Sequence, residues 1–286
     1  MKLNFTKMHG IGNDYIYVNC LDQKLDNPSL LAKKLSDRHF GIGSDGLVLI
    51  EPSRQADFTM SMYNSDGSQA EMCGNAIRCV ASYVYENKLI KKEDKLSLDI
   101  ETLAGIKKIK LSVENGHVSS IRVDMGEPVL EGTKIPVNID KPQVVDESVD
   151  IDGSIYRITC VSMGNPHAVI YVDQDVKTLD IETVGKKIEN FTSLFPRKTN
   201  VEFVKVIDRS CLSMRVWERG AGETLACGTG ACAVTVASAL NGYTDRTVPV
   251  TVHLIGGDLS VLWNKTDNHV YMSGTATKVF DGQIEV

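Results

Sequence analysis

The chain has 286 residues, 42% hydrophobic and 24% charged, a composition that excludes a disordered chain, a collagen and a small disulfide scaffold. With 31 basic and 37 acidic residues the net charge is −6, which argues against a nucleic-acid-binding protein. Lysines gather at Lys91, Lys92 and Lys95, but they alternate with acidic or apolar residues, which indicates a solvated face. No apolar run approaches the ~18 residues of a membrane span, so we expect neither a nucleic-acid nor a membrane partner. The first residues lack the apolar core of a signal peptide, which makes the cytoplasm the expected compartment.

Two sets of elements follow one another along the chain. The first set is predicted to comprise strand Tyr15–Asn19, helix Pro28–Arg38, strands Leu47–Ile50 and Asp57–Asn64, a helix after Cys73, and strands Lys95–Glu101, Ile106–Val113 and His117–Met125. The second is predicted to comprise strand Ala168–Asp173, helix Leu179–Asn190, strands Val201–Val206 and Leu212–Arg219, a helix after Cys227, and strands Val248–His253, Asp258–Trp263 and His269–Ser273. The later strands have hairpin spacing, which predicts antiparallel pairs.

The two sets repeat one pattern. Cys73 and Cys227 each precede a glycine and a run of small residues, and 154 residues separate them. Other pairs keep this offset to within two residues: Gly12-Asn13 with Gly164-Asn165, Tyr17 with Tyr171, Leu35 with Ile188, Gly46 with Asn200, Met60 with Met214, and Asn64 with Glu218. Because these pairs occur in the same order in both halves, they predict an internal duplication whose two copies join near residues 125–128. We therefore predict an α/β fold with mixed α+β sheets in two pseudo-symmetric domains, each a mostly antiparallel sheet wrapped around a central helix.

Seven cysteines are spread over the chain without a Cys-x-x-Cys motif, which favours free thiols over disulfides. The spacings of Cys73 to Cys79 and of Cys227 to Cys232 match no common zinc pattern, so we expect no metal site. Five cysteines are interpreted as buried and inert: Cys20, Cys79, Cys160, Cys211 and Cys232.

Cys73 and Cys227 have the sequence context of reactive thiols. A helix N-terminus offers unpaired N–H groups and a partial positive charge, which favour a thiolate and can also hold a carboxylate. Two such thiols on opposite faces of one carbon can invert a stereocentre next to a carboxylate, because one takes the α-proton and the other returns a proton. A small-molecule substrate with such a stereocentre is therefore expected.

Further polar residues stand at repeat-matched positions. Asparagine amides can bind both ends of an amino acid, and the candidates are Asn13, Asn64, Asn165 and Asn200. Glu218 and Arg219 offer a hydrogen-bond acceptor and a cationic fork. His167 could relay protons to a thiol.

Several motifs together resemble the diaminopimelate epimerase family. They are Met8–Asp14, Gly41–Gly46, Asn64–Arg78 around the first cysteine, Gly164–His167, Trp217–Gly220, and Gly220–Cys232 around the second cysteine. The resemblance covers nearly the whole chain, in order, and the two cysteine motifs are highly specific.

This resemblance implies a cofactor-independent epimerase that interconverts LL- and meso-diaminopimelate in lysine and peptidoglycan precursor synthesis. It implies that Cys73 and Cys227 are catalytic, with His167 and Glu218 assisting. It implies that Gly74-Asn75 and Gly228-Thr229 hold the reacting carboxylate, while the distal end is held by Asn13, Asn64, Asn165, Asn200 and Arg219. It further implies a homodimer and a last strand that returns to the first domain. The expected domains are residues 1–126 plus about 274–286, with Cys73, and residues 127–273, with Cys227.

Two positions depart from the family pattern. Ala76 replaces a glycine, and Gly46 stands where some members have a glutamine, so no substrate contact is expected at Gly46. One alternative is a cofactor-free racemase of the same fold for proline, hydroxyproline or histidine, although proline-type enzymes carry histidine at the position of Asn75. Another is a non-catalytic amino-acid-binding protein of this fold, which the loss of a cysteine would indicate.

Overall fold

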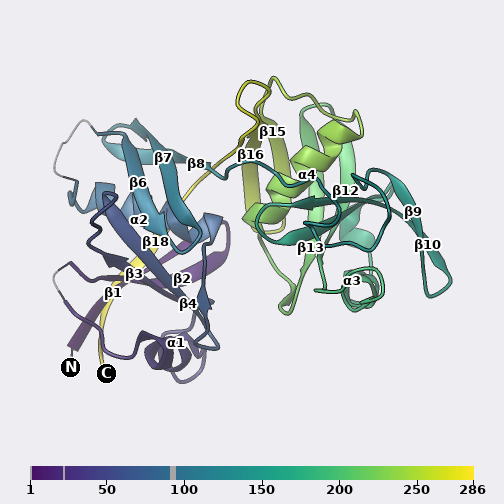
Figure 1. Ribbon diagram of the computed structural model, residues 1–286. Helices are drawn as coiled ribbons and strands as arrows, with labels where there is room; N and C mark the ends of the chain where they lie inside the picture. Colours follow the sequence, from purple (N-terminus) through teal and green to yellow (C-terminus); the bar gives the residue numbers. More distant parts are fainter. Residues whose placement is uncertain (1, 22, 91–94) are drawn as a thin grey trace. The chain divides into compact units, whose positions relative to one another are not determined.

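The computed structural model describes residues 2–21, 23–90 and 95–286, and the chain divides into two compact units (Figure 1). The first unit comprises residues 1–124 and 273–286, and the second comprises residues 125–272. Lys91 and Lys92, which the sequence places in a lysine-rich segment, lie outside the described residues. Lys95 pairs with Asp57.

The first unit is a sheet with two helices. Its strands are β1 (Lys2–Gly10), β2 (Asn13–Asn19), β3 (Gly46–Glu51), β4 (Phe58–Asn64), β5 (Gln69–Ala70), β6 (Ser97–Thr102), β7 (Gly105–Glu114), β8 (His117–Asp124) and β18 (Thr277–Glu285), and its helices are α1 (Pro28–Ser36) and α2 (Gly74–Glu86). Strand β1 pairs antiparallel with both β18 and β2. The β2–β3 and β4–β6 pairs are parallel, and the β3–β4, β6–β7 and β7–β8 pairs are antiparallel.

The second unit has the same order of paired strands as the first. Its elements are β9 (Glu147–Ile151), β10 (Ser154–Ser162), β11 (Pro166–Tyr171), a 3-10 turn (Val176–Thr178), α3 (Ile181–Glu189), β12 (Asn200–Asp208), β13 (Cys211–Glu218), β14 (Gly222–Glu223), α4 (Gly228–Leu240), β15 (Val250–Leu254), β16 (Gly257–Trp263) and β17 (Val270–Gly274), the last of which crosses the sequence boundary between the units. The β11–β12 and β13–β15 pairs are parallel, and the β10–β11, β12–β13 and β15–β16 pairs are antiparallel. From β1 to β7 and from β10 to β16 the parallel and antiparallel pairs therefore alternate identically. The predicted mixed α/β class is confirmed.

One helix in each unit is central and the other covers the opposite face of the sheet. Helix α2 packs against β1, β2, β7 and β8, whereas α1 packs against β3 and β4. Helix α4 packs against β10, β11, β12, β15 and β16, and α3 packs against β12 and β13 (Figure 1). In α4 residues 230–238 are all buried, because small side chains let strands approach on every side. The prediction that this helix is buried all round is confirmed.

Two predicted helix ends differ from the observed ones because side chains cap the backbone. Helix α1 ends at Ser36, two residues earlier than predicted, because Oδ1 of Asp37 accepts hydrogen bonds from the N–H groups of His39 and Phe40. Helix α3 begins at Ile181 because Asp180 accepts from the N–H of Thr183 at 3.1 Å.

Candidate functional site

Cys73 is the N-cap residue of α2, and its extended backbone (φ −135°, ψ 122°) leads directly into the helix. Its sulfur lies 3.4 Å from Oδ1 of Asn13, which also accepts a hydrogen bond from Nδ2 of Asn75 at 3.3 Å. Asn13 follows the β1–β2 turn, where Ile11 and Gly12 have positive φ angles of 48° and 87°, as a two-residue hairpin turn requires. The hairpin thus brings Asn13 to the N-terminal end of α2.

A group of charged residues fixes the orientation of Asn13. Its Nδ2 donates to Oδ2 of Asp45 at 2.7 Å, which leaves Oδ1 directed at Cys73. Arg38 donates to Asp14 at 2.8 Å and to Asp45 at 3.0 Å, and Lys7 pairs with Asp14 at 2.5 Å. Burial raises the pKa of Asp14, but hydrogen bonds from Arg38 and Lys7 outweigh it, so the pKa is lowered. The lowered pKa keeps Asp14 charged at neutral pH, while Asp45 accepts the hydrogen bond that holds the Asn13 amide.

The first turn of α2 is held by a completely buried arginine. Arg78 donates to the carbonyl of Gly74 at 3.1 Å, to Oδ1 of Asn75 at 3.0 Å and to the carbonyl of Thr275 at 3.1 Å. With its oxygen bonded to Arg78 and its Nδ2 directed at Asn13, the Asn75 side chain is fixed at both ends.

Asn64 and Gly46 lie opposite each other in the β3–β4 pair. The amide of Asn64 donates to Oγ of Ser68 at 3.0 Å, and its backbone N–H donates to the carbonyl of Ser68 at 2.8 Å. Gly46 packs so closely against the backbone of Tyr63 that a Cβ there would overlap its carbonyl oxygen. Any larger side chain at this position would therefore need a local shift of the strands.

Cys227 is the N-cap residue of α4 and is only 5% exposed. Its sulfur accepts a hydrogen bond from the N–H of Gly230 at 3.4 Å and lies 3.5 Å from Oγ1 of Thr229. Burial raises the pKa of the Cys227 thiol well above its usual range, and the carboxylates of Glu218 and Glu202 raise it further. Cys227 is therefore a protonated thiol at neutral pH.

His167 lies on β11 between two polar partners and is completely buried. Its Nδ1 is 2.6 Å from Oε1 of Glu202, and its Nε2 is 3.0 Å from Oδ1 of Asn165. Sequence reasoning missed Glu202. The available signal was a lone acidic residue between Val201 and Phe203, two apolar residues of a predicted strand.

Glu218 ends strand β13 beside Cys227. Burial raises its pKa, while hydrogen bonds from Thr224 and Cys227 and the charge of His167 act in the opposite direction. Oγ1 of Thr224 donates to Oε1 of Glu218 at 2.5 Å. A carboxyl group with a raised pKa next to a thiol can exchange a proton with it.

Asn200 and Arg219 are held together by backbone contacts. Oδ1 of Asn200 accepts from the N–H of Arg219 at 2.8 Å, and its Nδ2 donates to the carbonyl of Pro166 at 2.9 Å. The exposed guanidinium of Arg219 donates to the carbonyl of Arg197 at 3.1 Å. Both ends of the Asn200 amide thus bond to backbone groups, those of Arg219 and of Pro166, the residue before His167.

The predicted residues therefore form two clusters, one in each unit. In the first unit Cys73, Gly74, Asn75 and Asn13 come together, while Asn64 bonds within its own turn. In the second unit the cluster consists of Cys227, Gly228, Thr229, His167, Asn165 and Glu218, joined by Glu202.

The interpretation of the other cysteines is partly wrong. Cys79, Cys160 and Cys232 are fully buried, but Cys20 and Cys211 are half-buried. Cys20 directly follows the last residue of β2. Cys211 is the first residue of β13, and its sulfur lies 3.1 Å from Nε2 of His253. Both stand at strand ends, where solvent reaches one side.

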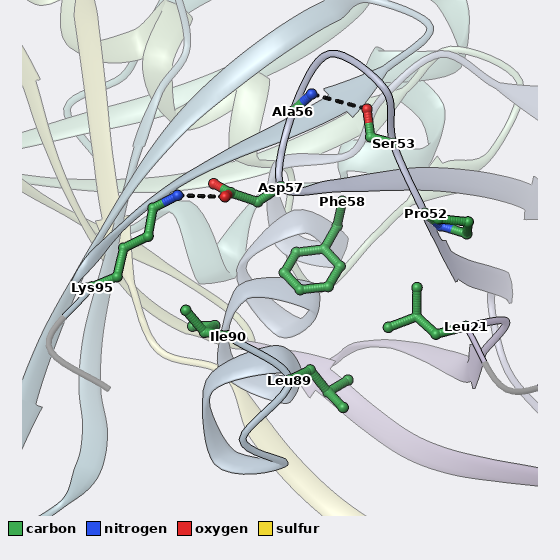
Figure 2. A pocket seen from close by; sticks show the side chains of 9 residues that line it. All are labelled: Leu21, Pro52, Ser53, Ala56, Asp57, Phe58, Leu89, Ile90 and Lys95. Carbon is green, nitrogen blue, oxygen red and sulfur yellow. Dashed lines mark hydrogen bonds and ion pairs between the residues drawn. The ribbon is translucent and has the colours of Figure 1, made fainter. Parts of the chain in front are cut away.

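A pocket of about 580 Å³ opens in the first unit away from Cys73 (Figure 2). Phe58, Leu89 and Ile90 form its apolar wall, and the Asp57–Lys95 ion pair closes one side. Leu89 and Ile90 follow the C-terminal end of α2, whereas Cys73 precedes its N-terminal end, about 20 Å away along a helix of this length. The pocket therefore does not belong to the candidate site.

The described part of the chain contains no helix with the length and hydrophobicity needed to cross a membrane. In the same residues, no three His, Cys, Asp or Glu side chains are grouped as metal ligands.

Comparison with known proteins gives a consistent result. The sequence profile of the diaminopimelate epimerase family matches residues 5–131 and 159–279. The chain is 59% identical to diaminopimelate epimerase of Acetivibrio thermocellus, over 99% of both chains, and 58% identical to that of Methanococcus maripaludis, over 99% of this chain and 100% of the relative.

Solved structures with low sequence identity share the fold. A phenazine biosynthesis protein of the PhzF family from Bacillus anthracis superimposes with a TM-score of 0.72 at 17% identity, covering 100% of both chains. A hydroxyproline epimerase from Agrobacterium vitis gives 0.72 at 13% identity, covering 99% of this chain and 91% of the other.

Proposed function

Because this chain belongs to the diaminopimelate epimerase family, we propose that it interconverts LL-2,6-diaminopimelate and meso-diaminopimelate without a cofactor, in lysine and peptidoglycan precursor synthesis. The observation that carries this proposal is 59% identity to a diaminopimelate epimerase over 99% of both chains. The same relationship supports action in the cytoplasm and a homodimer. It also supports the two compact units as the two epimerase halves, the first carrying Cys73 and the second Cys227.

The proposed chemistry is inversion by two thiols. One cysteine, as thiolate, takes the α-proton from one face of the substrate, so that the Cα–H bond breaks and its electron pair moves toward the carboxylate. The other cysteine, as thiol, donates a proton to the opposite face and becomes the thiolate. Two features support this scheme: both cysteines are N-cap residues, and each precedes backbone N–H groups that can bind a carboxylate, at Gly74-Asn75 and at Gly228-Thr229.

The surroundings of each thiol support a role for it in the proposed scheme. The raised pKa of Cys227 suits a proton donor. For the reverse reaction Cys227 must lose its proton, and Glu218 and His167 are the groups proposed to assist. Asn13, with its oxygen 3.4 Å from the Cys73 sulfur, is proposed to orient that thiol and the substrate.

The remaining proposed residues bind the distal amino-acid end of diaminopimelate. Arg219 can pair with its carboxylate, and amide oxygens can accept from its ammonium group. The proposed set is Asn13, Asn64, Asn165, Asn200 and Arg219, with Asn200 acting mainly by holding the Arg219 backbone.

The test is exchange of the α-proton in heavy water, followed by NMR, with enzyme treated with a chelator and given no pyridoxal phosphate. We expect deuterium at the α-carbon of LL- and meso-diaminopimelate, together with formation of the other isomer. Exchange on proline, hydroxyproline or histidine alone would replace the proposal with the related racemase. Exchange on none of them would replace it with a binding protein.

A further inference from the structure

Glu202 is a buried carboxylate on the inner face of the second unit. Side chains along a strand alternate between the two faces of a sheet. Val201 and Phe203 pack into the apolar cluster that includes Ile181 and Ile188 of α3, so Glu202 points to the other face, toward α4. The same reasoning applies to His167 on β11, because Ala168 packs into that cluster. The parallel pairing of β11 with β12 therefore brings both polar side chains beside α4.

The glutamate and the histidine form a close pair. Oε1 of Glu202 is 2.6 Å from Nδ1 of His167, and neither side chain is exposed to solvent. A carboxylate at this distance requires a hydrogen on Nδ1, since the carboxylate can only accept. The pair therefore fixes both the ring orientation and the position of one proton.

Helix α4 has a gap in its side chains where Glu202 approaches. A Cβ on Gly230 would lie 2.9 Å from Oε1 of Glu202 and 3.3 Å from the sulfur of Cys227. The absence of a side chain at Gly230 thus leaves room for the carboxylate next to the thiol. Oε2 of Glu202 is buried and makes no hydrogen bond within the described residues. An unsatisfied buried carboxylate oxygen is costly, so a role in stability alone does not explain the residue.

The charged and titratable groups around Glu202 come from four elements. They are His167 on β11, Cys227 at the start of α4, Glu218 on β13, and Cys160 on β10, and the charge of Glu202 raises the pKa of the last three. The imidazole is the one member of this set that can carry a compensating positive charge.

We propose that Glu202 is a positioning residue for the epimerase reaction: it holds the His167 ring with Nδ1–H directed at the carboxylate, so that Nε2 faces Asn165. This inference rests on the proposed function. Glu202 acts through His167 and does not touch the substrate.

The main variant is Glu202→Gln, which keeps the shape of the side chain and removes its charge. We expect kcat to fall at least about 100-fold while KM changes less than about 3-fold, and we expect the pH profile of kcat to shift. In a His167→Gln background, adding Glu202→Gln should change kcat less than about 2-fold, because the residue acts only through the ring. Equal losses in both backgrounds would overturn the proposal.

A surface pair provides the matched control. Nδ1 of His253 lies 2.7 Å from Oδ1 of Asp258, and both side chains are partly exposed. Asp258→Asn should remove that contact and leave kcat within about 2-fold. If it lowers kcat as much as Glu202→Gln, the loss is not specific to the His167 pair and the proposal fails.

A direct measurement is independent of activity and of whether the variant folds. In protein with ¹⁵N-labelled histidine, NMR should show His167 Nδ1 protonated throughout the pH range in which the protein is folded. An unprotonated Nδ1 would overturn the proposal. Failure of the proposed function would appear differently, as absent exchange in the parent protein with the Nδ1 signal unchanged.

Discussion

Oδ1 of Asn13 lies 3.4 Å from the sulfur of Cys73, and Nδ2 of the same side chain donates to Asp45 at 2.7 Å. The amide is therefore locked with its acceptor toward the thiol and its donor toward a carboxylate. Asp45 is itself held by hydrogen bonds from Arg38 and from the N–H of Asp14, so the carboxylate that fixes the amide has a defined position.

Asn13→Ala should lower kcat/KM for diaminopimelate by about 10- to 100-fold, because an oriented contact to the thiol is lost. It should cost only about 1 kcal/mol of stability, since Asp45 keeps its hydrogen bonds from Asp14 and Arg38. Steady-state kinetics and thermal melts check both values. Asn87→Ala, which removes a side-chain bond to the Tyr83 carbonyl at the other end of α2, is the control and should retain parent kinetics. Parent-like kinetics for Asn13→Ala would contradict the assigned orientation.

Cys73→Ala and Cys227→Ala should each abolish epimerisation, with losses above about 1,000-fold in both directions, because each variant lacks one proton-transfer group. Residual α-proton exchange should favour opposite stereoisomers in the two variants. The measurement is the epimerisation rate from each pure isomer, with folding checked by thermal melt.

The controls for this prediction are the fully buried cysteines. Cys79→Ala, Cys160→Ala and Cys232→Ala should keep most activity and lose about 1 kcal/mol of stability through packing. Turnover near the parent rate by folded Cys73→Ala or Cys227→Ala protein would show that the two-thiol mechanism is wrong.

Gly230→Ala should lower the epimerase activity while leaving the stability of the protein nearly unchanged. Alanine in a helix is ordinarily favoured over glycine by roughly 0.5–1 kcal/mol. Here the new Cβ would meet Oε1 of Glu202 at 2.9 Å and the Cys227 sulfur at 3.3 Å, and one of them must move. We expect activity to drop at least about 10-fold with little change in melting temperature. Unchanged activity would mean that the spacing between the carboxylate and the thiol is unimportant.

Thiol labelling should follow burial and pKa. Burial and the charge of Glu51 raise the pKa of Cys20 to about 12, so at pH 8 only about 1 in 10,000 of these thiols is ionised. Burial raises the pKa of Cys79 to about 11. Iodoacetamide labelling of Cys20 should therefore rise about tenfold per pH unit between pH 8 and 10, and Cys79 should react only after unfolding. Urea-unfolded protein, in which all seven thiols should react alike, is the control; rapid labelling of folded Cys20 at pH 7 would contradict the raised pKa.

The spacing of apolar residues in the sequence predicted those helices and strands in which that spacing reflects which side chains are buried. The helix after Cys227 was recognisable because apolar and small residues occupy every face, and burial on every face is what the structure has. Periodicity did not predict β1 or β18, because charged residues and glycine interrupt their alternation, and the last strand was expected only from the family resemblance. Strand β18 is largely exposed and pairs with β1 through backbone hydrogen bonds.

For the candidate site, sequence motifs indicated residues but not their partners. The carboxylate contact of His167 joins residues 35 apart in sequence and depends on the register of two parallel strands, which no local pattern specifies. Glu202 consequently looked like an ordinary polar interruption of an apolar strand. Asn200 was predicted to bind the distal end of the substrate, and its two backbone partners, Pro166 and Arg219, could not be inferred from the sequence.

The pairing of β18 with β1 has a consequence for the order of folding during synthesis. These two strands pair from Lys2 with Glu285 to His9 with Thr277, so β1 is completed by a strand that is translated only after the whole second unit. Until then β1 presents an unpaired edge, which is a template for association with other chains. The second unit, built from one continuous stretch of chain, can fold while the first still waits for its closing strand. Translation of the segment that follows the second unit, rather than of the first 124 residues, therefore sets the moment at which Arg78 can bond to Thr275 and the first turn of α2 becomes fixed.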